Sequence, residues 1–313
     1  MATSNLQPVA RYPAVLVSGA SGLIGSALVP CLTRSGHRVI ELRRHTAGQP
    51  APTAWWNPEA GTVNLEAAGT LDAVVHLAGE SVAQRWTPAA KARIRDSRVR
   101  GTRLLAETFA KLPNRPQVLV CASAIGYYGD RGVEILDEQS PAGAGFLPEV
   151  CRAWEEAAAP ARAAGIRVVH LRLGVVLAPN GGALAKLLPA FRWGVGGPFG
   201  SGNQYWSWTT LADLLRVVQY VLENESLQGP VNAVAPHPAT NRVFAQTLGR
   251  ALHRPSFFTV PAFAVKLLLG QMGQEALLAS ARVFPRKLEQ SGFVFEHPEL
   301  GGALRQVLDN PKP

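Results

Sequence analysis

The chain has 313 residues, a length that corresponds to one large domain or two closely packed ones. Hydrophobic residues make up 47% of it and charged residues 17%, which supplies a core and argues against a disordered chain. No stretch approaches the roughly 18 uncharged apolar residues of a membrane span, and the N-terminus lacks the order of a secretory signal. We therefore expect a cytoplasmic protein with no membrane partner.

The net charge of +9 permits an anionic partner, namely a phosphate-bearing cofactor, an acidic substrate or nucleic acid. The basic residues are spread in ones and twos without interleaved aromatic residues, so we expect no nucleic-acid partner. Cys31, Cys121 and Cys151 lie too far apart for a disulfide framework or a Cys-x-x-Cys metal site. We expect them to be small buried hydrophobic residues, and we expect no metal.

Short β-branched runs alternate with helical patterns in the N-terminal half, which is typical of a parallel sheet with crossover helices. The predicted strands are Ala14–Ser18, Arg38–Leu42, Ala73–Leu77, Gln117–Cys121 and Arg167–Leu171, with a later short strand at Val231–Val234. The predicted helices are Leu23–Ser35, Thr87–Leu112, Leu147–Ala164, Leu184–Trp193, Leu211–Glu223, Asn241–Leu252 and Ala262–Ser280. The fold class is α/β: a Rossmann-type doubly wound parallel sheet with a smaller C-terminal α/β substrate or cap domain.

The alternation of predicted strands and helices becomes less regular after about residue 178, where a Gly- and Pro-rich stretch surrounds a single apolar helix. We expect residues 14–177 to form a nucleotide-binding domain to which residues 209–236 return. Residues 178–208 and 237–308 then form the substrate domain, with a cleft between the two parts.

The strongest local motif is Gly19-Ala20-Ser21-Gly22-Leu23-Ile24-Gly25, which follows the first strand and opens a helix. Gly19 permits a tight turn, Gly22 lets the backbone approach a pyrophosphate, and Gly25 lets helix and strand pack closely. The helix N-terminus stabilises the anion. We therefore predict dinucleotide binding by Gly19, Ser21, Gly22, Leu23, Ile24 and Gly25.

The second strand ends in Arg43-Arg44, where an NAD-binding fold usually presents an acidic residue to the ribose. Guanidinium groups pair with a 2′-phosphate in bidentate geometry, so Arg43 and Arg44 favour NADP(H) over NAD(H). Glu41 is two residues too early to serve as the ribose ligand. The alternative is that both arginines belong to a solvated loop.

The third strand ends in His76-Leu77-Ala78-Gly79. The small residues Ala78 and Gly79, together with Leu77, let the chain pass close to the adenosine side of the cofactor. His76 precedes this bend within an apolar strand, and we interpret it as a packed core histidine.

Several separate sequence segments together resemble those of an extended short-chain dehydrogenase/reductase of the nucleotide-sugar epimerase type. They are the GASGLIG loop at 19–25, HLAG at 76–79, LAGESVAQRWT at 77–87, SRVRGTRLL at 97–105, SAIGYYGDRG at 123–132 and GVGGPFGSGNQYWSW at 194–208. More narrowly, the chain resembles the epimerase-like branch that carries a C-terminal domain of unknown function and is sometimes labelled a cell-division-inhibitor homologue. The resemblance spans about residues 14–308.

The resemblance implies hydride transfer at a nicotinamide, with a Ser and a Tyr-x-x-x-Lys pair handling the proton of the substrate. This chain departs from the pattern, because Phe146 and Val150 stand where that tyrosine and lysine are expected. Ser123 lies near the expected serine, and Tyr127 and Tyr128 are the nearest phenols, so these three are the predicted catalytic residues. Glu149 and Glu155 are further candidates for the proton donor, and packing roles for both tyrosines stay open.

Two more cofactor contacts follow from the resemblance. Arg98 stands at the position where the extended family has an asparagine, and it could reach a cofactor phosphate or a substrate anion. Val176 lies in the segment Arg172–Leu177, which resembles a stretch whose backbone borders the nicotinamide carboxamide. The segment Gly196–Trp208 fits an aromatic-walled substrate pocket and fits a packed loop equally well.

Two functions remain open. The first is an NADP(H)-dependent oxidoreductase or epimerase-like enzyme that acts on a small or nucleotide-linked hydroxyl or carbonyl substrate, and a homodimer is considered for it. The second is a non-catalytic NADP(H)-binding sensor, in which loss of the tyrosine and lysine is loss of chemistry.

Overall fold

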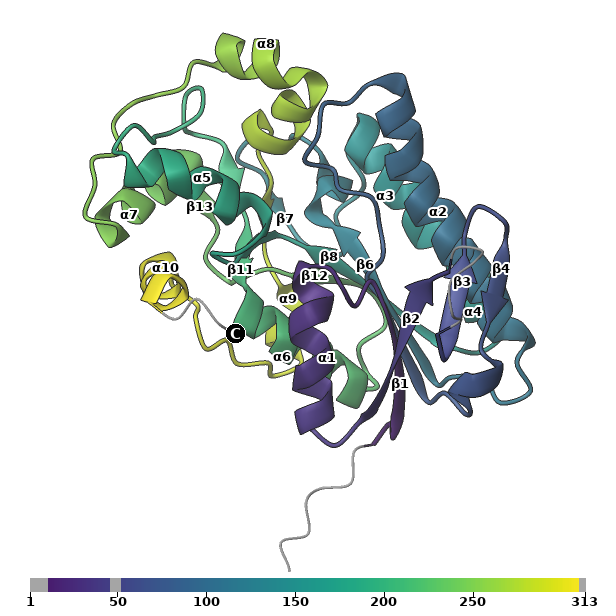
Figure 1. Ribbon diagram of the computed structural model, residues 1–313. Helices are drawn as coiled ribbons and strands as arrows, with labels where there is room; N and C mark the ends of the chain where they lie inside the picture. Colours follow the sequence, from purple (N-terminus) through teal and green to yellow (C-terminus); the bar gives the residue numbers. More distant parts are fainter. Residues whose placement is uncertain (1–10, 46–51, 310–313) are drawn as a thin grey trace, which may run out of the picture.

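The computed structural model describes residues 11–45 and 52–309. An eight-stranded sheet lies at its centre, with the strand order β12-β8-β6-β5-β1-β2-β3-β4 (Figure 1). In this order the strands span Gly229–Ala233, Arg167–Leu173, Val118–Ala124, Ala73–His76, Ala14–Ser18, Arg38–Arg44, Ala54–Asn57 and Thr62–Asn64. Neighbouring strands are parallel except for the antiparallel hairpin of β3 and β4. The predicted Rossmann-type sheet is confirmed.

Helices cover both faces of this sheet because its strands are apolar on both sides. Side chains alternate along β1, so Val15 and Val17 pack in the core under α1 (Leu23–Arg34) and α6 (Leu211–Glu223). Leu16 points to the opposite face and joins the core under α2 (Pro88–Lys111) and α4 (Ala159–Ala163). The helix α3 (Phe146–Glu156) lies on the same side as α2 (Figure 1).

The later part of the chain forms a further core beside the carboxyl ends of the strands. Helices α5 (Gly182–Arg192), α7 (Asn241–Ala251) and α10 (Leu300–Asp309) contribute to this core. Further helical elements of the later part are α8 (Ala262–Met272), the π-helical segment η3 (Gly273–Leu278) and α9 (Arg286–Gln290). Two-stranded pairs join β9 (Val175–Leu177) to β11 (Trp208–Thr210), β10 (Tyr205–Trp206) to β13 (Ala239–Thr240), and β7 (Ile135–Leu136) to β14 (Arg282–Val283). Trp206, Trp208 and Phe244 are buried in this core. The division of the chain into two domains stays a prediction.

Several elements differ from the sequence-based predictions, among them α9, α10 and the short strands β7, β10, β13 and β14, which were not predicted. The predicted helix Leu147–Ala164 is divided into α3 and α4, and the second of them begins beside Pro160, which has no N–H to bond back into the first. The predicted helix Ala262–Ser280 contains a kink at Gly270, whose φ is +59°, and then widens into η3. The hairpin of β3 and β4 was not predicted.

No helix in the described residues has the length and apolarity needed to cross a membrane.

Candidate functional site

The predicted site residues lie at one edge of the sheet. The carboxyl ends of β1, β5, β6 and β8 are neighbours there, because these strands are parallel and adjacent. From β1 the chain crosses one way to β2 and later returns to β5 on the other side, so the strand order reverses between β1 and β5. Such a reversal opens a crevice at the carboxyl ends of the strands, which is where doubly wound sheets bind ligands.

The glycine loop turns tightly between β1 and α1. Gly19 has a φ of +71°, and a Cβ there would lie 2.8 Å from the backbone nitrogen of Ala78. A Cβ on Gly25 would lie 2.2 Å from the Gly19 carbonyl oxygen, so both positions need glycine for packing. Gly22 is exposed and a Cβ on it would meet only that carbonyl, at 3.3 Å. The first turn of α1 has no side-chain cap, which leaves its N–H groups available to an anion.

The ends of β1 and β5 are joined by buried polar contacts. The Nδ1 of His76 lies 2.6 Å from Ser18 Oγ, and its Nε2 lies 3.0 Å from Thr102 Oγ1. Burial lowers the pKa of His76 to about 4, so this histidine is neutral at pH 7. The Leu77 N–H donates to Ser18 Oγ. His76 is therefore a packed core residue that fixes the 77–79 segment against the glycine loop.

The two arginines at the end of β2 have different surroundings. Arg43 donates from Nε and a terminal nitrogen to Oε2 of Glu41, at 3.2 and 3.0 Å. Arg44 is exposed and lines a hollow of about 410 Å³ together with Trp56, Glu80 and Arg100. Of the two guanidinium groups, that of Arg44 therefore has the open space that an adenosine phosphate requires.

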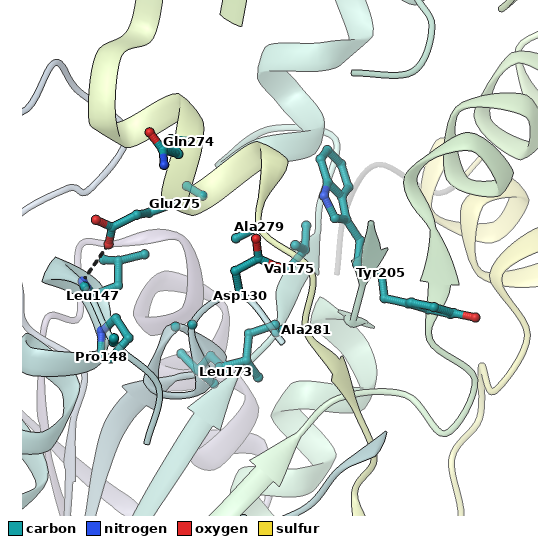
Figure 2. A pocket seen from close by; sticks show the side chains of 18 residues that line it. Asp130, Leu147, Pro148, Leu173, Val175, Tyr205, Gln274, Glu275, Ala279 and Ala281 are labelled. Carbon is teal, nitrogen blue, oxygen red and sulfur yellow. Dashed lines mark hydrogen bonds between the residues drawn. The ribbon is translucent and has the colours of Figure 1, made fainter. Parts of the chain in front are cut away.

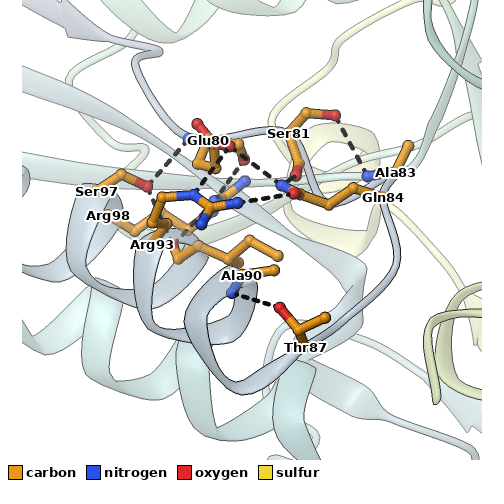
Figure 3. A network of polar contacts seen from close by, with 10 residues as sticks. Glu80, Ser81, Ala83, Gln84, Thr87, Ala90, Arg93, Ser97 and Arg98 are labelled. Carbon is orange, nitrogen blue, oxygen red and sulfur yellow. Dashed lines mark hydrogen bonds and ion pairs between the residues drawn. The ribbon is translucent and has the colours of Figure 1, made fainter.

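A polar network holds the loop after β5 against α2 (Figure 3). Arg98 donates to the carbonyl of Glu80 at 2.8 Å, and the Glu80 N–H donates to Ser97 Oγ at 3.0 Å. A Cβ on Gly79 would lie 3.3 Å from the Arg98 guanidinium carbon, so the loop runs directly over this side chain. Gln84 donates to Oε1 of Glu80. In this structure Arg98 positions the 77–80 segment; a direct contact with the cofactor stays a prediction.

A cavity of about 520 Å³ opens at the carboxyl ends of β6 and β8 (Figure 2). The sheet side contributes the 125–130 and 173–175 segments, α3 contributes its first turn, and η3 closes the cavity from the C-terminal part. Tyr205 and Trp206 also line it, whereas Trp208 is buried with its Nε1 bonded to the His237 carbonyl. The segment Gly196–Trp208 is therefore part pocket wall and part packed loop.

Two carboxylates line this cavity. Glu275 from η3 accepts hydrogen bonds from the N–H groups of Phe146 and Leu147, at 3.3 and 3.0 Å, and so caps α3 from across the cavity (Figure 2). Asp130 accepts through Oδ1 from the Ser280 N–H at 3.1 Å. No Lys, Arg or His is among the described lining residues.

The predicted catalytic residues belong to a buried network beside this cavity rather than to its lining. Ser123 donates to Oε1 of Glu155 at 2.7 Å. Arg172 forms a bidentate pair with the same carboxylate, at 2.8 and 2.9 Å. It also donates to Tyr128 Oη at 2.9 Å, and Tyr128 donates to Asn232 at 2.7 Å.

Both tyrosines pack on the same arginine. The guanidinium carbon of Arg172 lies 3.5 Å from the ring centroid of Tyr127 and 5.1 Å from that of Tyr128. Burial raises the pKa of Tyr128 to about 12, against the opposing effect of Arg172. Tyr128 is therefore a poor proton donor as it lies here, and catalytic roles for Ser123, Tyr127 and Tyr128 stay predictions.

Removal of the Glu155 carboxylate is expected to lower the free energy of unfolding by about 3–5 kcal/mol, because it leaves the Arg172 charge buried without its partner. Urea denaturation of Glu155→Ala measures this. Glu156→Ala is the matched control, since Glu156 is exposed and its pair with Arg162 is loose at 3.7 Å; we expect it to cost under about 1 kcal/mol. Equal losses of unfolding free energy in Glu155→Ala and Glu156→Ala would contradict the structural role of Glu155.

The remaining predicted contacts come together at the same edge. Val176 lies in β9 and pairs with Thr209. The turn after β9 reaches the glycine loop, because a Cβ on Gly181 would lie 2.7 Å from Leu23 Cδ1.

Sequence reasoning missed Asp130 and Glu275. Asp130 lies in the segment SAIGYYGDRG at 123–132, which resembles the family, and could have been found there. Glu275 lies 145 positions farther along the chain, and only the folded structure brings it to the cavity.

The fold and the site geometry define a Rossmann-type nucleotide-binding protein, and comparisons with known proteins agree. Residues 15–234 match the NAD dependent epimerase/dehydratase family, and residues 260–307 match a domain of unknown function, DUF1731. An epimerase family protein of Mycobacterium bovis is 41% identical over 95% of this chain and 98% of its own length. The human epimerase family protein SDR39U1 is 36% identical over 94% of this chain and 99% of its own length. The chain belongs to the NAD-dependent epimerase/dehydratase family, which confirms the resemblance found in the sequence.

Solved structures show the same relationship. A crystal structure of human SDR39U1 with NADPH superposes with a TM-score of 0.84 at 35% identity, over 95% of this chain and 99% of that one. A UDP-glucose 4-epimerase of Thermus thermophilus in complex with NAD has a TM-score of 0.71 at 20% identity, over 95% of this chain and 98% of that one, and shows the shared fold.

Proposed function

We propose that this protein binds NADP(H) along the carboxyl edge of its sheet and acts as an oxidoreductase or epimerase-like enzyme on a hydroxyl or carbonyl compound. The observation that carries the proposal is the cavity of about 520 Å³ at the carboxyl ends of β6 and β8, on the edge that carries the glycine loop. Its size is within the usual range for small-molecule sites. The NADPH bound by human SDR39U1 supports the choice of cofactor.

Separate groups of residues would bind the cofactor and the substrate. The N–H groups at the start of α1 would bind the pyrophosphate, and Arg44 would pair with the 2′-phosphate. When bound, the nicotinamide supplies or accepts the hydride. The segment η3 from the C-terminal part forms one wall of the cavity. Asp130 is the lining carboxylate that we assign to the substrate proton, because hydrogen bonds from Ser280 and Gly132 engage only its Oδ1.

The cavity favours an uncharged or cationic substrate over a nucleotide-sugar. A diphosphate placed there would face Asp130 and Glu275 with no cation among the described lining residues to neutralise it. Apolar side chains such as Leu147, Leu173 and Val175 form much of the remaining wall. A small ketone, aldehyde or alcohol fits this chemistry.

The alternative function is a non-catalytic NADP(H)-binding sensor, which is favoured by the replacement of the tyrosine and lysine with Phe146 and Val150. The test is to incubate the protein with NADPH and a panel of ketones, aldehydes and nucleotide-sugars. Stereospecific hydride transfer to a neutral carbonyl compound supports the enzyme. Tight NADPH binding with constant absorbance across the panel favours the sensor. A cytoplasmic location and a homodimer remain part of the proposal.

Gly22→Val is expected to abolish NADPH binding and leave the protein folded. The added side chain enters the space needed by the pyrophosphate, and its Cβ meets only one protein atom, the Gly19 carbonyl oxygen. Calorimetric titration with NADPH measures the loss, and circular dichroism checks the fold. A folded variant that binds NADPH normally would place the phosphate site elsewhere.

A further inference from the structure

Large apolar side chains are exposed mainly on one part of the molecule. Eleven such residues are exposed in the described chain, and eight of them belong to the segments 178–208 and 237–274. These eight are Trp193, Val195, Val243, Phe257, Phe258, Phe263, Leu267 and Leu268. Trp193 is 84% exposed and Leu267 is 75% exposed. Soluble monomers rarely leave so many large apolar groups together in water, and such patches mark interaction sites.

Contacts between the segments place these residues on neighbouring elements. The turn after α5 packs against the loop after α7, because Arg254 Nε donates to the Arg192 carbonyl at 3.0 Å. The Val260 N–H donates to the Pro198 carbonyl at 2.9 Å, and the rings of Phe257 and Phe258 lie 4.5 Å apart. The helix α8 begins two residues later and lies at the same end of the molecule as α5 and α7 (Figure 1). We call Trp193, Val195, Phe257, Phe258, Phe263, Leu267 and Leu268 the apolar end surface.

The two segments that carry this surface are cationic, and the first acidic residue after them is Glu275, which caps α3. Residues 178–208 and 237–274 contain no Asp or Glu, although the average of the chain would place about five acidic residues there. They contain six Lys and Arg residues, all exposed: Lys186, Arg192, Arg242, Arg250, Arg254 and Lys266. None of the six forms an ion pair in the part of the chain that the structure describes. Arg192 adjoins Trp193, and Lys266 lies beside Leu267.

We propose that the apolar end surface docks on a membrane that contains anionic lipids. Apolar side chains beside cations are the combination that such an interface binds: the apolar groups enter the boundary of the acyl chains, and the cations are attracted to the anionic headgroups. A second copy of this chain fits less well, because two identical cationic surfaces would repel each other. A nucleic acid would neutralise the cations, but its phosphates would not cover the aliphatic side chains of α8.

The proposed contact differs from a membrane span, and it departs from the expectation of no membrane partner. The surface also adjoins the candidate site, since α8 continues into η3, which supplies Gln274 and Glu275 to the cavity wall. Docking would therefore place one wall of the cavity close to the bilayer. The proposal concerns binding alone and does not depend on the proposed function.

The test is co-sedimentation of the full chain with phosphatidylcholine vesicles and with vesicles in which roughly one third of the lipid is phosphatidylserine. We expect binding to the anionic vesicles and little to the neutral ones. The triple variant Phe263→Ser, Leu267→Ser, Leu268→Ser should lower the partition coefficient at least tenfold. The matched control is Val133→Ser with Ile135→Ser, which removes exposed apolar side chains outside the two segments and should bind like the unmodified chain. Circular dichroism checks that each variant is folded.

Four results would overturn the proposal. The first is no binding to anionic vesicles at low salt. The second is binding that the triple variant leaves unchanged, which would show that the net charge of +9 alone attracts the vesicles. The third is a dimer in sedimentation velocity that the triple variant dissociates, because a second copy would then cover the surface. The fourth is equally tight binding to single-stranded DNA that the triple variant weakens in parallel, which would make this a nucleic-acid surface.

Discussion

Arg44→Ala is expected to weaken NADPH binding at least tenfold and to leave NADH binding nearly unchanged. The unmodified chain should bind NADPH at least tenfold tighter than NADH, because a guanidinium group at the end of β2 pairs with the 2′-phosphate and NADH has none. A charge-assisted hydrogen bond of about 1.5–3 kcal/mol corresponds to roughly a tenfold to hundredfold change in affinity. Calorimetric titration of both nucleotides measures it.

Arg43→Ala is the control for this prediction. Its guanidinium group already pairs with Glu41 on the same side of the strand, so removing it should reduce NADPH affinity by less than the Arg44 substitution does. A larger loss of NADPH affinity in Arg43→Ala than in Arg44→Ala would mean that the cofactor breaks the Arg43–Glu41 pair on binding. Equal affinities for NADPH and NADH in the unmodified chain would refute the assignment of NADP(H).

The parallel sheet could be predicted because its strands are nearly continuous apolar runs between helices. The strand β1 is buried at all five positions, which gives a strong local signal. The hairpin of β3 and β4 has no such signal: β3 contains two tryptophans in only four residues, and its pairing with β2 is set by the tertiary fold. The division of the predicted 147–164 helix could have been read from Pro160, whereas the widening of η3 leaves no comparable mark in the sequence.

The candidate pyrophosphate-binding half of the site could be proposed from the sequence because one short segment contains all of its residues. Gly19, Gly22 and Gly25 act through backbone geometry, and a spacing of three residues records that geometry in the sequence. The substrate half is assembled from distant segments, so its ionisable groups have no common motif. Ser123 was chosen because it lies near the serine position that the family resemblance implies, and Tyr128 because it is one of the nearest phenols. Neither criterion shows whether a side chain faces a cavity or a buried arginine.

Asp130→Asn is expected to lower turnover of a carbonyl substrate about a hundredfold or more, the common size of a general acid–base contribution. Asp130 lines the cavity, and the substitution keeps the size of the side chain while removing the carboxylate to which we assign the substrate proton. NADPH affinity should barely change. Steady-state kinetics with a substrate found in the panel, together with titration of NADPH, separates the two effects.

The competing assignments make different predictions for the same assay. If one of Ser123, Tyr127 and Tyr128 handles the proton, then the matching substitution should lower turnover about a hundredfold or more, and Asp130→Asn should not. The matching substitutions are Ser123→Ala, Tyr127→Phe and Tyr128→Phe. From the structure we expect Tyr128→Phe to act mainly on stability, by about 1–3 kcal/mol, because it leaves Asn232 without a donor in a buried site.

In a sensor, Phe146→Tyr combined with Val150→Lys should create no activity, because the cavity would not be shaped for a substrate. Hydride transfer by the unmodified chain excludes the sensor, and the variant that then loses turnover at constant NADPH affinity identifies the proton donor.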